Sequence, residues 1–418
     1  MNCWDVSAST TTRAAARPTL PCVLSVNGGT SSLKFALYES GAALKRILGG
    51  RIERIGMGYG ALVVQRAQAP QATAHSVDVD DHAAAVTLLV RWLEGEVGPD
   101  AIGVIGHRIV HGMHHVEPQA ITPALLQELR SFTPQDPQHL AGALALVEAC
   151  GHAYPALPQV ACFDTAFHRG MPRVATLLPI PRRYEALGVQ RYGFHGLSYA
   201  FLMEELARLD GAQAAQGRVV LAHLGHGASL AAVHRGRSID TSMGFTPSSG
   251  IPMGTRAGDL DPGIADYLEQ IEHMPRHEFD AMVQHASGLL GMSGTSGDMR
   301  VLLAREAGDP RAAEAIAMFC YQARKCVGAY AAALGGIDTL VFAGGIGEHA
   351  APVRARICEG LEFLGIAIDA ARNAAHAPII SSAASRVVVR VVRTDEEQMI
   401  ARSVCRVAGL QCAEGGPC

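Results

Sequence analysis

Short apolar runs alternate with amphipathic segments along most of the chain. Residues 22–26 form an apolar, β-branched run, residues 27–32 follow as a turn rich in Gly and Ser, and residues 33–39 alternate as in a half-buried strand. A second strand–glycine turn–strand unit spans residues 219–234. Two such units, each followed by alternating helices and strands, favour a duplicated α/β fold, although one repeated hairpin is weak evidence by itself.

Apolar residues spaced by three and four predict helices at 82–97, from Pro123 to about residue 130, and at 316–334. Thr122 is interpreted as the N-cap of the second helix, because Pro often occupies the position after such a cap. Buried strands are predicted at four apolar runs, residues 102–105, 158–163, 339–343 and 387–392. Because helices and strands alternate throughout, the fold class is α/β.

The composition is that of a chain that folds and buries large cores. Its 418 residues are 49% hydrophobic and 18% charged, and the length corresponds to two or three domains. A net charge of −4 without a basic block argues against nucleic-acid binding, and no apolar run approaches the ~20 residues that span a membrane. The ten cysteines form no CxxC pair, so thiols in a reducing cytoplasm are expected.

Both ends of the chain are interpreted as tails. Residues 1–21 are rich in Ser, Thr and Ala, and the expectation is a disordered segment. A transit peptide is the alternative, whereas the apolar run is too short for a secretory signal. Residues 409–418 carry two Cys and a Gly-Gly-Pro and are expected to fray.

Three glycine-rich turns each follow an apolar strand, at Asn27–Gly29, Gly225–Gly227 and Gly344–Gly347. Turns with little side-chain bulk let backbone N–H groups approach phosphate oxygens, so the three together favour phosphate binding. A plain tight turn is the alternative for each. None is a Walker A loop, because no Gly-Lys-Ser/Thr follows, and the third lacks the GxGxxG spacing of dinucleotide sites.

Four charged or titratable residues lie where ligands are commonly bound. Arg108 follows the strand at 102–105, and Arg256 lies in a glycine-rich loop; Arg suits bidentate contact with carboxylate or phosphate. Asp164 ends a buried strand, which is a ligand position in open α/β sheets. His195 stands just before a helix. The structural alternatives are ion pairs for the arginines and, for His195, helix capping or a buried, hydrogen-bonded imidazole.

The segment 394–397 opens the last helix. Thr394 and Glu397 fit a capping box, Ser/Thr-x-x-Glu, which assigns Glu397 a structural role. Glu396 is left at a helix N-terminus, where its carboxylate could reach a metal ion or its waters. No HExxH motif or Cys-based ligand set is present, so no zinc site is predicted. Three further histidines have no evident partner, namely His111, His114 and His115.

In their order along the chain, these motifs resemble those of the acetate and propionate kinases, a family of the sugar kinase–Hsp70–actin superfamily. The resemblance extends from about residue 22 to residue 408. The matching strings are SVNGGTSSLKF (25–35), GHRIVHG (106–112), FDTAFH (163–168), RYGFHG (191–196), HLGHGAS (223–229), DTSMGFTP (240–247), PMGTRAGD (252–259), SGLLGMS (287–293), GDMR (297–300), GGIGE (344–348) and TDEE (394–397).

The resemblance implies a duplicated ribonuclease-H-like fold of two domains, an active site in the cleft between them, and a homodimer. It implies reversible phosphoryl transfer from ATP to a short-chain carboxylate, acetate in the first instance, giving acetyl phosphate and ADP. The cofactor would be Mg²⁺, with Mn²⁺ as the alternative. The domains would span residues 22–164 and 165–394, with the helix 395–408 joining the first and tails at 1–21 and 409–418.

The resemblance also assigns roles by matching motif. Asn27 and Glu396 would serve the metal. The catalytic set would be Arg108, which contacts the carboxylate, with Asp164, His195 and Arg256, the last two stabilising the transferring phosphoryl group. The substrate's methyl group would be enclosed by Val110, Phe194 and Pro247. The nucleotide would be held by Lys34, His223, Leu224, Gly225, His226, Gly227, Asp298, Met299, Arg300, Gly345, Ile346, Gly347, Glu348 and His349.

A short-chain carboxylic acid, with a pKa near the value of about 4.3 for Glu, is ionised at neutral pH, so its attacking oxygen needs no general base. Catalysis would then rest on positioning and charge neutralisation. We therefore expect Asp164 to orient an arginine or a metal-bound water rather than to remove a proton.

The sequence departs from the family pattern at three places. His226 replaces the Asn of HLGNGAS and His349 replaces the Asn of GIGEN, so both put an imidazole near the expected nucleotide. Gln135 and Asp136 replace the His and Asn of APLHNP, close to the expected acyl pocket. Neutral drift is one explanation. The other is that the two histidines change nucleotide preference or make nucleotide affinity depend on pH.

Three other functions stay open from the sequence. One is the same chemistry with propionate preferred, the second uses another phosphoryl donor such as pyrophosphate, and the third is a catalytically silent nucleotide-binding sensor. Against the sensor stands the presence of all the charged positions of the set, Arg108, Asp164, His195, Arg256 and Glu396.

Overall fold

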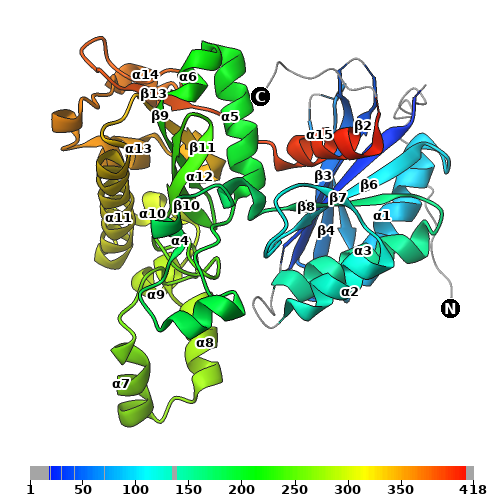
Figure 1. Cartoon of the computed structure of the whole chain (residues 1–418), viewed down its shortest axis with the longest axis horizontal. Helices are drawn as coiled ribbons and strands as arrows, with labels where there is room; N and C mark the ends of the chain where they lie inside the picture. The colour runs from blue at the N-terminus through cyan, green and yellow to red at the C-terminus, as the bar shows by residue number, and fades with distance from the viewer. Residues whose placement is uncertain are drawn as a thin grey trace.

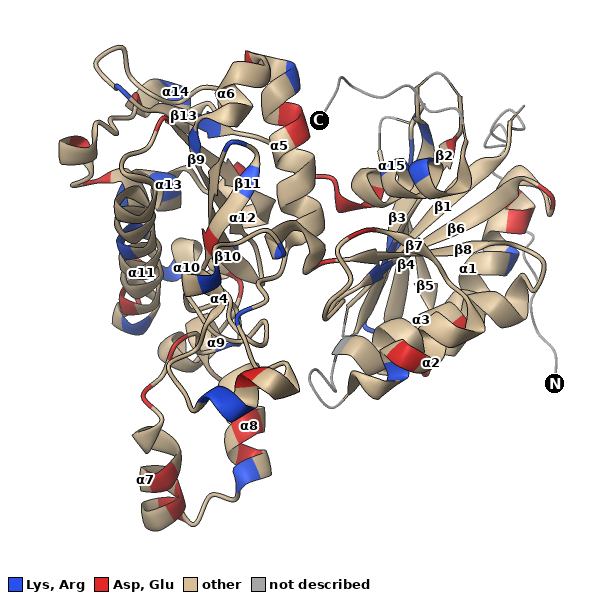
Figure 2. Cartoon of the chain, viewed as in Figure 1, with Lys and Arg blue, Asp and Glu red and all other residues tan. Residues whose placement is uncertain are grey.

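The computed structural model describes residues 18, 20–29, 31–41, 43–69, 71–133 and 139–410. The tails expected at 1–21 and 409–418 lie largely outside these residues, as do Gln135 and Asp136. Figure 1 shows two sheets side by side, each with helices packed against it. Basic and acidic residues are interspersed along the ribbon of both halves (Figure 2). In the described part of the chain, no helix is long and apolar enough to cross a membrane.

The first sheet has eight strands in the order β5-β4-β3-β2-β1-β6-β8-β7. β1 and β2 are the predicted hairpin and pair antiparallel, which places Asn27 opposite Lys34. On the other side of β1, β6 and β8 continue the sheet in parallel. The strand bounds are β1 (Cys22–Gly28), β2 (Ser32–Glu39), β3 (Lys45–Glu53), β4 (Gly60–Arg66), β5 (Thr73–Val77), β6 (Ile102–Ile109), β7 (Gln119–Ala120) and β8 (Gln159–Phe163).

The second sheet has five strands in the order β11-β10-β9-β12-β13. β9 and β10 form the second predicted hairpin, and β12 and β13 continue the sheet in parallel to β9. This is the order of β3-β2-β1-β6-β8 repeated, three antiparallel strands followed by two parallel ones, so the predicted duplication is confirmed. The bounds are β9 (Arg218–Leu224), β10 (Ala228–His234), β11 (Arg237–Thr241), β12 (Thr339–Ala343) and β13 (Val388–Val391).

The three predicted helices are present as α1, α2 and α11. Thr122 is the N-cap of α2, because its side chain accepts the N–H of Leu125. The helix bounds are α1 (His82–Val97), α2 (Pro123–Ser131), α3 (His139–Ala153), α4 (Arg173–Thr176), α5 (Gly196–Asp210), α6 (Ala212–Gln216), α7 (Gly263–Glu272), α8 (Arg276–His285), α9 (Gly288–Ser293), α10 (Met299–Arg305), α11 (Pro310–Leu334), α12 (Gly344–His349), α13 (Ala351–Cys358), α14 (Ala370–Ala374) and α15 (Glu396–Ala408).

Both faces of the first sheet are buried, because alternate residues of a strand point to opposite faces. Leu24 and Val26 of β1 belong to the core under α1 and α3, whereas Val23 belongs to the core under α15 and α5. α5 contributes to two cores at once. Its Phe201 joins the core of the first sheet, and its Leu202 joins a core of the second. One helix therefore packs against both sheets.

Two local expectations were wrong. Arg108 does not follow the strand but lies within it, since β6 continues to Ile109. The polar pair His107 and Arg108 hides this continuation in the sequence, yet both side chains are partnered, His107 by the side chain of Gln159 at 2.6 Å. The third glycine-rich turn is also not a turn, because Gly344 is the first residue of α12.

The capping box at the start of α15 is also wrong. Asp395 is the N-cap, and its side chain accepts the N–H of Gln398 at 2.8 Å. Thr394 instead contacts Ser198, with 2.7 Å between the two hydroxyl oxygens. Thr394 and Asp395 could each cap the helix, and only the folded backbone selects Asp395. Glu397 therefore does not have the capping role that the sequence predicted for it.

The cysteines only partly follow the expectation of thiols throughout. Cys405 is disulfide-bonded. Spacing along the sequence does not report which cysteines approach one another after folding, so it could not indicate this bond. The free thiols of the described residues are Cys22, Cys150, Cys162, Cys320, Cys326 and Cys358.

Candidate active site

Arg108 and Asp164 form an ion pair at the carboxyl ends of the neighbouring parallel strands β6 and β8. Arg108 Nη2 lies 2.6 Å from Asp164 Oδ2, and the Asp164 side chain is fully buried. Burial alone would lower the pKa of Arg108, but the nearby Asp164 and Glu396 carboxylates outweigh it and raise the pKa. Arg108 Nε is buried and has no hydrogen-bond partner. The guanidinium is therefore charged and keeps donor capacity for an anionic ligand.

The same Asp164 carboxylate caps α5. Oδ2 also accepts the N–H of His195 at 3.0 Å, and Oδ1 accepts the N–H of Leu197 at 3.3 Å. A carboxylate at this position satisfies the free N–H groups of the helix and favours its positive end. Asp164 thus fixes both Arg108 and His195. Both of its oxygens accept hydrogen bonds from N–H donors.

His195 is a buried, hydrogen-bonded imidazole whose side chain does not cap the helix. Its backbone is left-handed, with φ of 60°, a conformation that few residues other than glycine adopt. Nδ1 lies 2.8 Å from Ser229 Oγ, which lies 2.5 Å from the Tyr199 hydroxyl. Burial, and next the stacked ring of His223, lower the pKa of His195 well below 6.5. The imidazole is therefore neutral near pH 7.

Arg256 reaches the same place from an irregular loop. Its Nη1 donates to the Pro247 carbonyl at 2.6 Å. A Cβ atom added to Gly227 would lie 2.6 Å from Arg256 Nη2 and 3.4 Å from His195 Nε2. A side chain at position 227 would therefore displace the Arg256 guanidinium. The β9–β10 turn, the Arg256 guanidinium and the His195 imidazole therefore lie close together.

Asn27 is the centre of a second group of side chains. Its Nδ2 donates to Glu396 Oε2 at 2.8 Å and to Glu397 Oε1 at 3.1 Å, and its Oδ1 accepts from Arg108 Nη1 at 3.4 Å. Burial alone would raise the pKa of Glu396, but nearby cations, Arg108 foremost, lower it. Burial raises the pKa of Glu397. The structure thus brings Asn27 and Glu396 together and adds a second carboxylate.

The residues expected around the acyl group lie next to these charges. Val110 and Phe194 are 3% and 1% exposed and belong to the same buried cluster. Val110 is two residues beyond Arg108, and Phe194 immediately precedes His195. Pro247 is buried, and its carbonyl holds Arg256. Apolar and cationic side chains are therefore adjacent in the fold as well as in the sequence.

The segments expected at the nucleotide contribute unequally. Gly225–Gly227 is the β9–β10 turn, closed by a 3.0 Å bond from the N–H of Gly225 to the Gly227 carbonyl. Leu224 and Met299 have core side chains, so only their backbones are available to a ligand. His223 contacts Ser198, with 2.7 Å between Nδ1 and the hydroxyl oxygen. Lys34 is exposed on β2.

The other nucleotide candidates are mostly exposed ends of helices. Asp298 caps α10 and pairs with Arg300, whose side chain is 89% exposed. Glu348 Oε1 accepts the N–H groups of Gly344 and Thr394, so this carboxylate ties α12 to the segment before α15. His226, like His349, is exposed, and the remaining candidates occupy α12, namely Gly345, Ile346 and Gly347.

Sequence reasoning missed three residues of this site. Glu397 was assigned to a cap, and Ser229 and Tyr199 were not singled out. Glu397 could have been found from its neighbour Glu396. A helix cap needs one carboxylate, and two adjacent carboxylates at the start of this helix leave one for another role. Ser229 and Tyr199 are ordinary strand and helix residues, and only the folded chain shows that they line up behind His195.

The sequence matches the Acetokinase family over residues 22–402. An acetate kinase of Rhodopseudomonas palustris is 43% identical over 392 residues, which cover 92% of this chain and 98% of that protein. A propionate kinase of Citrobacter rodentium is 41% identical over 392 residues, which cover 92% of this chain and 96% of that protein. Acetate and propionate kinases are thus about equally similar to this chain.

Solved structures agree with this. An acetate kinase of Porphyromonas gingivalis superposes with a TM-score of 0.83 at 34% identity, covering 93% of this chain and 100% of that one. A propionate kinase of Francisella tularensis gives 0.86 at 34%, covering 92% and 99%. The fold is therefore the duplicated, actin-like ribonuclease-H-like fold that the resemblance implied. The chain is a kinase and belongs to the acetokinase family.

Proposed function

We propose that the protein is an acetate kinase, which transfers the terminal phosphoryl group of ATP reversibly to acetate and forms acetyl phosphate and ADP. The observation that carries the proposal is the convergence of cationic and donor groups, Arg108, His195 and Arg256, beside the apolar Val110 and Phe194. Such a set suits a carboxylate with a short alkyl group that faces a phosphate. The relatives named acetate kinase support the same assignment.

Arg108 would bind and orient the substrate carboxylate. The acid is already ionised at neutral pH, so one carboxylate oxygen attacks phosphorus without losing a proton first. The barrier then comes mainly from bringing two anions together, and fixed positive charge lowers it. Asp164 holds Arg108 in place, and the unpartnered Nε shows that the protein alone does not use all of its donors.

His195 would donate a hydrogen bond from Nε2 to the transferring phosphoryl group. Burial raises the pKa of Tyr199 above its usual range, so its hydroxyl keeps its proton. Tyr199 then donates to Ser229, and Ser229 donates to Nδ1 of His195. A neutral imidazole that accepts at Nδ1 carries its hydrogen on Nε2. This order places the donor on the side of His195 that faces Arg256.

Asn27, Glu396 and Glu397 would hold the divalent cation. Carboxylate oxygens are ligands that Mg²⁺ prefers, and here two carboxylates meet at the Nδ2 group of one amide. The residues present therefore fit a Mg²⁺ site, with Mn²⁺ as the alternative. When bound, the cation would neutralise phosphate charge next to Arg108. Asn27 would keep the two carboxylates together on their shared side.

Propionate is the second candidate substrate, favoured by the relatives named propionate kinase at 41% identity and by a solved propionate kinase. Acetate and propionate differ by one methylene, which an apolar pocket distinguishes by only about 1–3 kcal/mol. Gln135 and Asp136, which differ from the family pattern, lie outside the described residues. The preferred acid is therefore a matter for direct measurement.

Hydroxylamine trapping of the acyl phosphate tests the proposal. Purified protein is incubated with ATP and Mg²⁺ and with acetate, propionate or butyrate, and hydroxamate formation is compared. We expect signal with acetate strongest. Signal strongest with propionate replaces acetate by the second candidate. Silence with all three acids in folded protein contradicts both, and the assay is then repeated with pyrophosphate before ATP binding without turnover is taken to indicate a sensor.

A further inference from the structure

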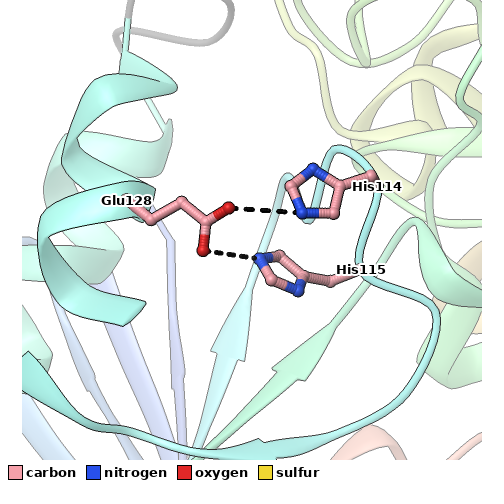
Figure 3. A group of neighbouring side chains, drawn as sticks. All are labelled: His114, His115 and Glu128. Atoms are coloured by element: carbon pink, nitrogen blue, oxygen red, sulfur yellow. Dashed lines mark ion pairs between the residues drawn. The ribbon is translucent and has the colours of Figure 1, made fainter. Parts of the chain in front are cut away.

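His114 and His115 face Glu128 from the turn that follows β6 (Figure 3). His114 Nε2 lies 3.2 Å from Glu128 Oε1, and His115 Nε2 lies 3.4 Å from Glu128 Oε2. No partner for these histidines was evident in the sequence, because Glu128 lies on α2, a separate element. Among the described residues, these three side chains could together hold a metal ion, because their ligand atoms all lie within 4.8 Å of one another.

The backbone of the turn places both imidazoles on one side. Successive side chains of an extended strand point in opposite directions. Here Met113 has a positive φ of 49°, and the N–H of His115 donates to the Gly112 carbonyl at 2.8 Å. The chain therefore reverses between the two residues, and the rings of His114 and His115 lie 4.4 Å apart. The backbone of the turn, and not the side-chain rotamers alone, therefore brings the two imidazoles together.

Two neighbouring side chains hold the His115 ring in place. Its ring stacks on Phe163 at 4.9 Å with 13° between the planes, and its Nδ1 lies 2.8 Å from the Gln119 amide. If that amide turns over, its oxygen accepts a hydrogen from Nδ1 and leaves the Nε2 lone pair free. His115 Nε2 is buried and has no hydrogen-bond partner, so its contact with Glu128 does not satisfy it.

The distances match those around a small metal ion. Zn²⁺ binds His nitrogen at ~2.0–2.1 Å and carboxylate oxygen at ~2.0–2.2 Å, so neighbouring ligand atoms of a tetrahedral site lie roughly 3.3 Å apart. Each imidazole nitrogen lies at close to that distance from one of the two carboxylate oxygens, His114 Nε2 at 3.2 Å from Oε1 and His115 Nε2 at 3.4 Å from Oε2. Two imidazoles with one carboxylate favour Zn²⁺ and similar transition metals over Mg²⁺.

We propose that His114, His115 and Glu128 bind one divalent transition-metal ion of the Zn²⁺ type, with water completing the coordination. The His114 side chain is 63% exposed, which gives the ion access from solvent. The ion ties α2 to the turn that follows Val110 and, through the stacked Phe163, borders β8, which ends just before Asp164. This site is separate from the cation site at Asn27, and its geometry does not depend on the proposed reaction.

The test uses the full-length protein, stripped with EDTA and returned to excess Mg²⁺. Calorimetric titration with ZnCl₂ is expected to show one ion per chain, and Co²⁺ is expected to give the intense visible absorption of a tetrahedral site. The exposed ligands are changed in His114→Ala and Glu128→Gln, each expected to bind at least about tenfold more weakly. His277→Ala, an exposed histidine on α8, is the matched control and keeps wild-type affinity.

Two outcomes overturn the site. One is folded wild-type protein that takes up no Zn²⁺ in excess Mg²⁺, and the other is unchanged affinity in both ligand variants. Acetyl phosphate formation is measured in the same EDTA-treated protein with Mg²⁺ alone. Activity there with no Zn²⁺ binding rejects the metal site and keeps the proposed function, whereas binding without activity does the reverse.

Discussion

Asp164 Oδ2 accepts hydrogen bonds from the Arg108 guanidinium and from the backbone N–H of His195. One fully buried carboxylate therefore sets the positions of a cation on the first sheet and of the residue that opens α5. Since α5 packs against both sheets, this contact lies where the two halves of the fold are joined. Asp164 is thus placed to act on the reaction through its neighbours.

Asp164→Asn tests that orienting role. Asparagine keeps the shape but removes the charge of the carboxylate that holds Arg108, so we expect kcat to fall about 100-fold, or about 2.7 kcal/mol, with the KM for ATP nearly unchanged. Steady-state kinetics and circular dichroism on the purified variant measure the loss and the fold. Asp210→Asn is the control, because it breaks the ion pair with Arg390 at the far end of α5 and should keep kcat. Near wild-type turnover of Asp164→Asn would contradict the role.

Gly227→Ala tests the convergence of Arg256 and His195. A Cβ atom would meet Arg256 Nη2 at 2.6 Å, so the guanidinium must move. We expect at least about a tenfold loss of kcat, or about 1.4 kcal/mol, with the protein folded. Gly328→Ala in α11 is the control, because a Cβ there meets nothing within 4 Å. That variant should keep its activity and gain about 0.5–1 kcal/mol in stability. An equally active Gly227→Ala enzyme would exclude this use of the turn.

Val110→Ala tests the acyl pocket. Removing two methyl groups beside Phe194 enlarges the apolar space, so we expect the ratio of kcat/KM for propionate to that for acetate to rise about 3- to 10-fold. Val110→Ile adds bulk at the same position and should shift the ratio toward acetate. Hydroxamate assays with both acids give the ratios. If neither variant changes the ratio, Val110 does not line the pocket.

His226→Asn tests whether nucleotide affinity depends on pH. Partial burial of the ring of His226, a residue that is otherwise exposed, and next the charge of Arg256 lower its pKa from 6.5. The ring is therefore neutral at pH 7 and gains a positive charge only below pH 6.5, where we expect tighter ATP binding. The KM for ATP from pH 5.5 to 8.5 should fall at the acid end in the wild type and stay flatter in the variant. His349→Asn reports the second histidine, and identical profiles in all three proteins remove the hypothesis.

His107→Gln tests the pH dependence of stability. Burial lowers the pKa of His107 to about 4, whereas the unfolded value is about 6.5. The unfolded state then binds more protons in that window, so the free energy of unfolding is fully retained above about pH 6.5 and falls as the pH drops toward 4. We expect the wild type to lose about 1.4 kcal/mol per pH unit more than the variant. Urea unfolding at several pH values measures both slopes, and parallel slopes would contradict the assignment.

The sequence predicts the hairpins and the long helices because each has a strong local pattern. Thr122 before Pro123 and the apolar stripe of α11 need no partner from elsewhere in the chain. It fails where several residues offer the same local function, as Thr394 and Asp395 do for the cap of α15. It also fails where a polar pair interrupts a strand, as His107 and Arg108 do in β6, because the partners that satisfy such residues come from other strands.

The candidate site follows the same division. Motifs name Arg108, Asp164, His195, Arg256 and Glu396 by their residue types and their resemblance to a family. They do not show that Asp164 is already engaged with two donors, that Ser229 and Tyr199 stand behind His195, or that Glu397 joins Asn27. These relationships connect residues far apart in the chain, so no local pattern carries them.

The contact between Asn27 and Glu396 joins side chains 369 positions apart. A ribosome that adds about 5–20 residues per second needs roughly 20–70 s to pass from one to the other. Once β8 has been made, the first sheet exists without α15 for the rest of that interval, and its apolar face lacks the cover of this helix. The proposed cation ligands are completed only when synthesis is nearly finished, so catalytic competence arrives in a single late step. A chain released before its last helix would hold ten or more correct strands and still be inert.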